Sequence, residues 1–193
     1  KSAIIQFGLF LQSNPGGEQK KADANMRIAD GHFVLKENAN AIKYYKNVIE
    51  LHAQYEDQAL YYMALTYGYI QGKSQEKVSN LLSIINNFPE SRYVQASVLQ
   101  VAQTYKADEE YDKALKYFNK IVIDYPNSIE VPSARINIAD IHFKQGKPAK
   151  AEQEYISVMN EFGSDNSICT TVANALKDMY TQTNQLDKID GLA

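Results

Sequence analysis

The chain has 193 residues, 45% of them hydrophobic and 22% charged, which is the composition of a folded protein with a sizeable core. Its formal net charge of −3, with lysines and arginines scattered along the sequence, disfavours a surface built for nucleic acid or anionic lipid. The single cysteine, Cys169, excludes an internal disulfide and, by itself, a structural zinc site.

In chain order, the first predicted element is an amphipathic helix over residues 2–13. On it Ile4, Phe7, Phe10 and Leu11 recur at three- and four-residue steps. One basic residue and no small-residue cleavage site distinguish this segment from a signal peptide. Neither this segment nor any later one approaches the roughly 20 apolar residues that span a bilayer, so we expect no membrane insertion.

The same periodicity predicts helices along the rest of the chain, and no alternating run or Asn-Gly dipeptide indicates a strand. The ranges are 18–36, 39–54, 56–71, 74–87, 91–107, 111–124, 129–145, 148–161, 166–182 and a clipped helix from about 185. Gly72 and Gly146 fall where a helix must stop, so we expect positive φ there. Pro148 suits the first turn of the helix that it opens. The sequence therefore predicts an all-α fold of short-linked helix pairs.

A repeat with a period near 37 residues organises these helices. Pro89 and Pro126 are 37 residues apart, and each is preceded by an aromatic residue and followed two residues later by Ser. Alanines recur at the same distance, in the pairs Ala102 and Ala139, and Ala114 and Ala151. The proline disfavours helical geometry at the residue before it, and Ser91 is placed to cap the following helix. The aromatic-Pro-x-Ser phrase is thus predicted to be the joint between repeats.

The order of small residue, aromatic residue three positions later, turn, alanine, aromatic residue and proline resembles the tetratricopeptide repeat. The four units that show it are Ala29, His32, Ala41 and Tyr45; Ala64, Tyr67, Leu81 and Pro89; Ala102, Tyr105, Ala114, Phe118 and Pro126; and Ala139, His142, Ala151 and Tyr155. The resemblance implies a right-handed α-α superhelix of about five helix-turn-helix units, a single solenoid over 1–193. The repeats are expected at approximately 1–17 (half), 18–54, 55–90, 91–127, 128–164 and 165–193 (truncated). Because both end repeats are partial, we expect a piece of a longer array.

Two features depart from the usual pattern of the family, and one of them points to a particular group of its members. The family's usual period is about 34 residues, and its first-helix Trp is missing, as this chain has no Trp. A longer period with an aromatic-Pro-x-Ser joint is similar to bacterial cell-envelope members, namely outer-membrane assembly lipoproteins and the periplasmic repeat protein that works with the Tol–Pal system. This narrower resemblance implies a periplasmic or outer-membrane-associated protein, with the cytoplasm as the alternative.

Candidate reactive side chains do not assemble into a catalytic constellation. His32 and His142 occupy equivalent repeat positions three units apart, too distant to share a metal, and are interpreted as substitutes for the tyrosines at the matching positions. His52 is interpreted as a surface or capping residue and Cys169 as a packed thiol. We expect no enzyme activity, no cofactor and no metal.

The resemblance implies that peptide ligands bind a concave face lined by the first helices of successive repeats. Carried over by position, the contact residues are Arg27, Asp30, Phe33, Tyr62, Leu65, Gln100, Gln103, Lys106, Asn137, Asp140 and Phe143. For each of them a solvated helix surface is the competing interpretation. Tyr61, Tyr62 and Tyr69 are candidates to decorate a groove, because they lie on the least regular unit.

These observations favour a non-enzymatic scaffold or adaptor within a larger bacterial envelope protein, which binds a protein or peptide on the concave face. The alternative is a regulatory or substrate-recruiting repeat domain of a larger enzyme or sensor. Nucleic acid is not an expected partner, and self-association through cut repeat ends is a further option.

Overall fold

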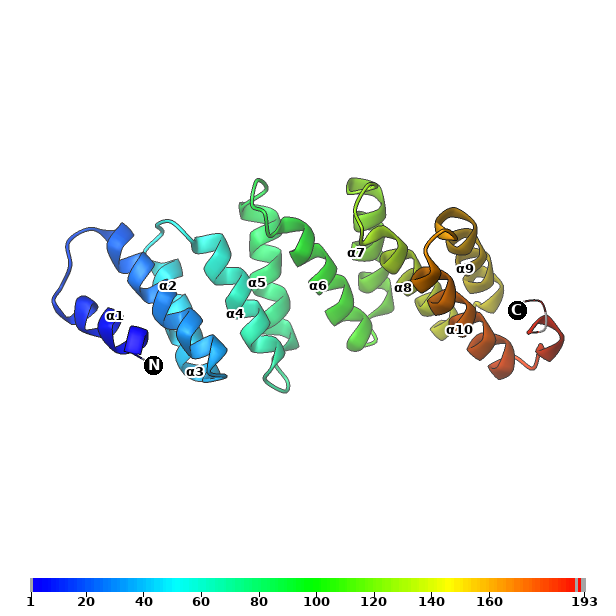
Figure 1. The fold of residues 1–193 in the computed structure, drawn as a ribbon, viewed down its shortest axis with the longest axis horizontal. Helices are drawn as coiled ribbons and strands as arrows, with labels where there is room; N and C mark the ends of the chain where they lie inside the picture. The colour runs from blue at the N-terminus through cyan, green and yellow to red at the C-terminus, as the bar shows by residue number, and fades with distance from the viewer. Residues whose placement is uncertain (1, 190, 192–193) are drawn as a thin grey trace. The chain divides into compact units, whose positions relative to one another are not determined.

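The computed structural model describes residues 2–189 and 191, and within them the chain forms α-helices and one 3-10 turn but no strand. The helices are α1 (Ser2–Gln12), α2 (Glu18–Val34), α3 (Asn38–Glu50), α4 (Glu56–Gly68), α5 (Ser74–Asn87), α6 (Val94–Ala107), α7 (Tyr111–Asp124), α8 (Val131–Lys144), α9 (Pro148–Phe162) and α10 (Asn166–Gln182) (Figure 1). The all-α prediction is confirmed. The helix predicted from about residue 185 is wrong in the part that is described, where a 3-10 turn spans Leu186–Lys188; residues 190, 192 and 193 lie outside the described residues.

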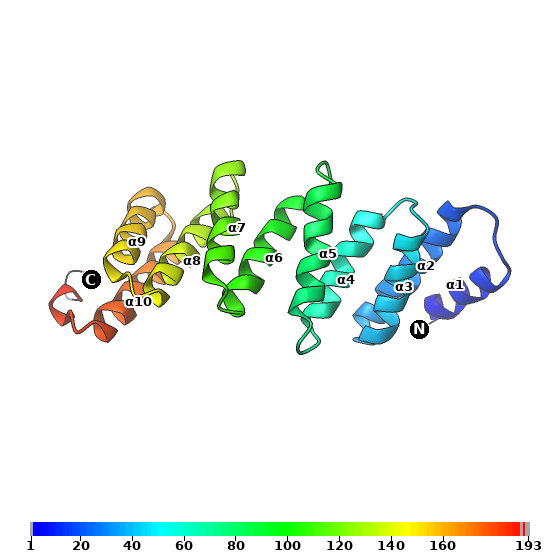
Figure 2. The same ribbon diagram turned by 180° about the vertical axis from the view of Figure 1, so that it is seen from behind.

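The chain divides into two compact units, Lys1–Val101 and Ala102–Ala193, and the division falls inside α6. In the first unit, α1 to α5 follow one another, each packed on the helix before it. Figures 1 and 2, seen from opposite sides, show α2 and α4 in one layer and α3 and α5 in the other. In the second unit α8 and α10 form one layer and α7 and α9 the other. Each unit is thus a row of helix pairs.

A small residue and an aromatic residue at fixed spacing build the core of three helix pairs. Their second helices bury three side chains at i, i+4 and i+7: Ala41, Tyr45 and Val48 in α3, Ala114, Phe118 and Ile121 in α7, and Ala151, Tyr155 and Val158 in α9. α5 differs and buries Val78, Leu81 and Ile84. The alanine lets two helix axes approach to about 8–10 Å, and the ring fills the space one turn away. The predicted packing alanines of the first helices are fully buried as well: Ala29, Ala64, Ala102 and Ala139.

The turn inside each helix pair ends the first helix with a left-handed residue. The residues concerned recur every 36 to 38 positions: Lys36, Gly72, Glu109, Gly146 and Asn184. In four of the five turns the next backbone N–H donates to the carbonyl of the aromatic or His residue five positions earlier: Glu37 to His32, Glu110 to Tyr105, Lys147 to His142, and Gln185 to Tyr180. The positive φ predicted for Gly72 and Gly146 is confirmed, at 75° and 73°.

The aromatic-Pro-x-Ser joint ends one repeat and opens the next. α5 ends at Asn87, directly before Phe88 and Pro89, as predicted. The Ser91 hydroxyl then accepts the N–H of Tyr93 at 3.1 Å, and the Ser128 hydroxyl accepts that of Glu130 at the same distance. The following helices begin only at Val94 and Val131, so the predicted starts at 91 and 129 are wrong. Each serine closes a turn that precedes the helix, because its side chain bonds the backbone two residues on rather than the first helical turn.

Candidate functional site

Three of the predicted contact residues in the first unit meet around a buried tyrosine. The Phe33 ring on α2 packs edge-on against Tyr62 on α4, with centroids 5.8 Å apart. Tyr62 stacks on Tyr45 of α3 at 6.4 Å, and the Tyr45 hydroxyl donates to Asp30 at 2.9 Å. Asp30 and Phe33 of one repeat and Tyr62 of the next therefore lie together around Tyr45.

The ring contacts extend beyond these residues. Tyr69 packs on Phe33 at 6.1 Å, while Tyr62 meets both Tyr61 and Tyr93, at 5.6 and 6.2 Å. We call this set the aromatic cluster; its members are Phe33, Tyr45, Tyr61, Tyr62, Tyr69 and Tyr93. Arg92 closes it at one side, with its guanidinium 4.9 Å from the Tyr93 centroid. Burial raises the pKa of the Tyr61 and Tyr62 hydroxyls, which are protonated at neutral pH even without this shift.

A cavity of about 510 Å³ opens beside the aromatic cluster. Its lining residues are Phe33, Val34, Lys36, Asn38 and Tyr69. Val34 is 77% exposed and Tyr69 72% exposed, so two apolar surfaces stand in solvent at its edge. Lys36 and Asn38 add a cation and an amide to this apolar hollow. The arrangement suits an apolar or aromatic side chain with an anionic or hydrogen-bonding group next to it.

Asp30 and Asp140 each bond a buried tyrosine of the following helix, fifteen residues later. Asp30 accepts from Tyr45, and Asp140 accepts from Tyr155. A buried phenol needs a hydrogen-bond acceptor, and the carboxylate supplies it. Burial raises the pKa of Asp30, while the Tyr45 hydrogen bond and the charge of Arg27 act in the opposite direction. Both aspartates therefore support the core as well as facing outward.

In the second unit the predicted residues of α6 and α8 form a polar network. The Lys106 ammonium donates to Asn137 at 2.7 Å and to Asp140 at 2.5 Å. Phe143, one turn beyond Asp140, packs against the buried cluster that contains Tyr155. Lys106, Asn137 and Asp140 are thus joined by hydrogen bonds, and Phe143 is partly drawn into the core.

The remaining predicted residues differ in exposure. Arg27 is exposed and forms an ion pair with Asp23 at 3.4 Å. Leu65 and Gln100 are half-buried in the first unit, and Gln103 is exposed in the second. The positions carried over from the repeat pattern therefore include both solvent-facing and partly packed side chains.

Two of the three histidines and the cysteine take part in packing, whereas His52 is exposed and lies 3.5 Å from the Glu56 carboxylate. His32 stacks on Tyr44 with centroids 5.6 Å apart, and its Nδ1 lies 2.6 Å from the Glu37 carboxylate. His142 is buried, and its Nδ1 has no hydrogen-bond partner among the described residues. Burial, with the charges of two nearby lysines, lowers the pKa of His142. Cys169 is half-buried, and its thiol contacts the Gly163 carbonyl at 3.4 Å.

The described part of the chain contains neither a cluster of metal-ligating side chains nor a helix suited to cross a membrane. In that stretch, no three side chains of His, Cys, Asp or Glu gather as metal ligands would. Over the same residues, none of the helices combines the length and the apolar character needed to cross a bilayer.

Sequence reasoning missed Val34, Lys36 and Asn38 as lining residues. Val34 extends the helix beyond Phe33, where the periodic pattern is ending, so its exposure carries no periodic signal. Lys36 lies in the turn between α2 and α3, Asn38 begins α3, and both line the cavity together with Tyr69 of the next repeat. Tyr69 itself was a predicted groove candidate.

Comparison with known proteins agrees with this architecture. The tetratricopeptide repeat family matches residues 58–91 and 96–128 of the chain. No curated protein sequence matches it. Among solved structures, MamA superposes with a TM-score of 0.71 at 14% identity, covering 90% of this chain and 88% of that one. BtubC (BKLC) from P. vanneervenii gives 0.68 at 12% identity, covering 100% and 84%.

A third structure, the thermophilic TPR protein TTC0263 of Thermus thermophilus, gives a TM-score of 0.55 at 17% identity and covers 90% of this chain and 88% of that one. At such identities the likeness concerns the fold alone. The chain has the all-α helical-repeat fold of tetratricopeptide repeat proteins, and its two matched stretches support a place in that superfamily.

Proposed function

We propose that the chain is a non-enzymatic scaffold that binds a protein or peptide through the aromatic cluster and its adjoining cavity. Tetratricopeptide repeats and the similar solved structures support an interaction scaffold in general terms. The observation that carries the specific proposal is the pair of exposed side chains, Val34 and Tyr69, at the edge of a cavity of about 510 Å³. Covering apolar surface yields roughly 25 cal/mol per Å², and tyrosines are frequent centres of binding energy.

The lining indicates which ligand fits. An apolar or aromatic side chain would fill the hollow beside the packed rings of Phe33 and Tyr69, and a carboxylate on the same peptide would pair with Lys36. In the second unit, Lys106 already satisfies Asn137 and Asp140, so that network offers a shaped polar surface rather than a free charge. We therefore place the anchoring contact in the first unit.

The cellular setting that we propose is the bacterial envelope, in the periplasm or at the outer membrane. Its support is the pair of aromatic-Pro-x-Ser joints, Phe88 to Ser91 and Tyr125 to Ser128, repeated at 37 residues. Fractionation of the cells that produce the protein tests this proposal, and recovery in the cytoplasmic fraction alone would contradict it.

The binding proposal is tested by placing a photo-crosslinking amino acid at Tyr69 and, as a matched control, at Ile123. Ile123 is 73% exposed, about as much as Tyr69, but lies at the end of α7 in the other unit. We expect a discrete crosslinked protein from position 69 that is absent from position 123. With that protein purified, Tyr69→Ala should weaken binding by about ten-fold or more, whereas Ile123→Ser should leave it unchanged. Identical crosslinking from both positions, or equal affinities, would refute the assignment.

A further inference from the structure

The aromatic cluster carries tyrosine hydroxyls that the protein itself does not use. Two hydroxyls of the cluster are engaged in hydrogen bonds within the chain, at Tyr45 and Tyr93. The hydroxyls of Tyr61, Tyr62 and Tyr69 form no hydrogen bond with another described residue. All three side chains are half-buried or exposed, and none of their hydroxyls is buried from solvent. The cluster therefore offers three accessible phenol donors next to apolar ring surface.

The repeat does not require aromatic rings at these positions. The residue two positions before the packing alanine is Tyr62 in one repeat, but it is polar in the others: Arg27, Gln100 and Asn137. The residue five positions after the packing alanine is Tyr69 in the same repeat, and the others have Val34, Ala107 and Lys144. Both tyrosines are thus additions of this part of the chain rather than elements of the repeat pattern.

A cation lies at each end of the row of ring contacts that runs from Tyr69 to Tyr93. Lys36 lines the cavity at the Tyr69 end, and Arg92 covers the Tyr93 ring at the other. Both cations belong to exposed residues, and neither forms an ion pair with another described residue. The nearby carboxylates are already engaged: Asp30 with Tyr45, Glu37 with His32, and Asp57 with Ser91. The row therefore complements a ligand with an anionic group at each end.

The spacing of the rings along this row fits an extended peptide. The centroids are 6.1 Å apart from Tyr69 to Phe33, 5.8 Å from Phe33 to Tyr62, and 6.2 Å from Tyr62 to Tyr93. A polyproline II helix rises about 3.1 Å per residue, so each step corresponds to about two residues and the row to at most about six. Proline-rich peptides in this conformation dock on aromatic-lined surfaces, and their backbone carbonyls have no internal hydrogen bonds. Those carbonyls can accept the phenol hydroxyls.

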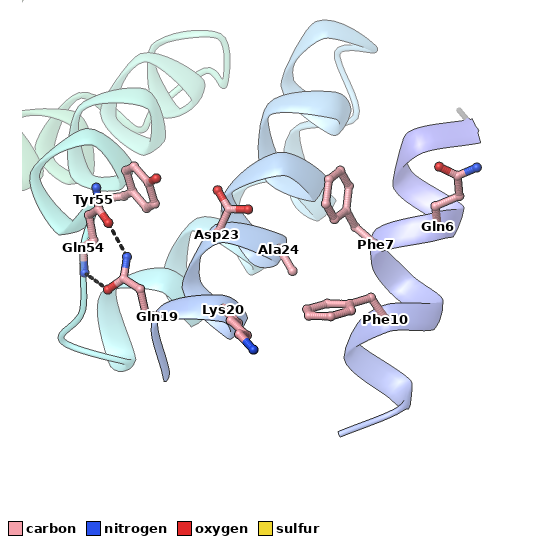
Figure 3. A pocket seen from close by; sticks show the side chains of 9 residues that line it. All are labelled: Gln6, Phe7, Phe10, Gln19, Lys20, Asp23, Ala24, Gln54 and Tyr55. Carbon is pink, nitrogen blue, oxygen red and sulfur yellow. Dashed lines mark hydrogen bonds between the residues drawn. The ribbon is translucent and has the colours of Figure 1, made fainter. Parts of the chain in front are cut away.

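A cavity between α1 and α2 does not share this chemistry. Figure 3 shows Phe7 and Phe10 of α1 pointing toward α2, beside a cavity of about 470 Å³. At the far wall the Gln19 side chain donates to the Gln54 side chain and accepts the Gln54 backbone N–H at 3.3 Å (Figure 3). These two amides are already paired, and both rings of α1 lack a hydroxyl. The donor array of the aromatic cluster is not repeated there.

We propose that the aromatic cluster binds a proline-rich segment of a partner protein in the polyproline II conformation, with an acidic residue at each end of the segment. This inference rests on the proposed function and names the ligand class of the same site. Proline rings pack on the aromatic rings, the free phenol hydroxyls donate to backbone carbonyls, and the two carboxylates pair with Lys36 and Arg92. Because a proline-rich chain already favours this conformation, binding costs little conformational entropy.

Other ligand classes fit these features less well. A helical peptide bonds its own carbonyls, so it would leave the three phenol donors without acceptors. A cationic ligand, which aromatic clusters also bind, would meet Lys36 and Arg92 at the two ends of the row. Single-stranded nucleic acid would stack on the rings, but two cations in a chain of formal net charge −3 make a poor track for its phosphates.

The test is fluorescence anisotropy of labelled peptides titrated with the 193-residue chain. The probe is Glu-Pro-Pro-Ala-Pro-Pro-Glu, and its control is the all-D mirror image, which has the same composition and charge but a polyproline helix of opposite hand. We expect the L-peptide to bind about ten-fold or more tightly than the D-peptide. Replacing both glutamates of the probe by glutamine should weaken binding by about three-fold, and by less in Lys36→Gln, where one ion pair is already absent.

Removing a single hydroxyl gives the sharpest variant. Tyr62→Phe keeps the ring and deletes one donor, so the affinity for the L-peptide should fall by about three- to ten-fold. The matched control is Tyr44→Phe, because Tyr44 is also half-buried and its hydroxyl bonds no other described residue, but it stacks on His32 outside the cluster. Tyr44→Phe should bind the L-peptide as tightly as the unchanged chain. Circular dichroism verifies that both variants keep their helices.

The remaining outcomes overturn the inference. Equal affinity for the two mirror images would do so, as would no binding up to about 1 mM or an unchanged affinity in Tyr62→Phe. Oligothymidylate that displaces the peptide and loses affinity in Tyr62→Phe would assign the cluster to single-stranded nucleic acid instead. Crosslinking from Tyr69 captures a partner whatever its conformation, so failure of the peptides leaves the proposed function separately testable.

Discussion

The packing of α1 on α2 depends on the absence of a side chain at Gly31. A Cβ atom at this position would lie 2.7 Å from Cγ1 and 2.9 Å from Cδ1 of Ile4. Ordinary contacts of this kind are about 3.5–4.0 Å. Gly31→Ala must therefore displace the Ile4 side chain, by a change of its rotamer or by a shift of α1, and either change disturbs the packing of α1 on α2.

Two opposing effects set the free-energy change that Gly31→Ala causes. Alanine in place of a helical glycine stabilises the helix by roughly 0.5–1 kcal/mol. Overpacking at a close contact costs about 1–3 kcal/mol, so Gly31→Ala should weaken the docking of α1 by up to about 2 kcal/mol. Gly68→Ala is the matched control, since its Cβ would lie 3.5 Å from Lys77 Cδ, an ordinary contact. Gly68→Ala should therefore gain the helix stabilisation of roughly 0.5–1 kcal/mol without an opposing steric cost.

Hydrogen–deuterium exchange read by mass spectrometry measures this effect locally. In Gly31→Ala the amides of α1 should exchange up to about 30-fold faster, while those of α4 keep their protection. Truncating Ile4 to Ala removes the clashing atoms, so adding Gly31→Ala to that variant should cause no further loss. Unchanged exchange in Gly31→Ala, or an equal effect in both backgrounds, would refute the reasoning.

Three further predictions concern the core and the turns. Glu109 has a left-handed φ of 58°, so Glu109→Gly should raise the free energy of unfolding by about 1 kcal/mol in urea titrations, whereas Glu109→Ala should give no gain. Tyr155→Phe should lower the free energy of unfolding by about 1–3 kcal/mol, because the Asp140 carboxylate loses the hydroxyl that donates to it. An unchanged free energy of unfolding would contradict the role of this hydrogen bond. Burial lowers the pKa of His142 below its ordinary 6.5, so the unfolded chain binds the proton more readily and stability should fall as pH drops through 6.5. His142→Phe should lose that part of the slope when urea midpoints are compared between about pH 7.5 and pH 5.5, and parallel slopes would exclude the assignment.

Much of the fold follows from the sequence because helical periodicity is a local property. The predicted ranges 74–87, 111–124 and 166–182 coincide with α5, α7 and α10. The starts of α6 and α8 were predicted too early, since a serine that closes a turn and a serine that caps a helix have the same sequence signal. Two of the left-handed turn residues are glycines and were predicted. The others carry side chains; asparagine tolerates this geometry at Asn184, but no residue preference marks Lys36 or Glu109.

The candidate site was predictable only as a set of positions. Repeat register places Asp30 and Phe33 on one face, but it treats each helix alone and gives no information about the tyrosine fifteen residues later. The cavity beside Tyr69 depends on how side chains from α2, α4 and the turn at Lys36 meet. The repeat period in the sequence does not reveal which side chains of neighbouring repeats come into contact.

The hydrogen bonds from Tyr45 to Asp30 and from Tyr155 to Asp140 link the outer face to the interior. At the corresponding repeat position, Gln103 is exposed and the buried ring fifteen residues later is Phe118, which has no hydroxyl to satisfy. A protein engineer who wishes to alter ligand preference can therefore vary Gln103 without leaving a hydroxyl unsatisfied on the ring fifteen residues later. The aspartate positions behave differently, because each can change safely only together with its tyrosine. We therefore expect this surface to diversify by paired substitutions at Asp30 and Asp140, each with its tyrosine, and by single substitutions at Gln103.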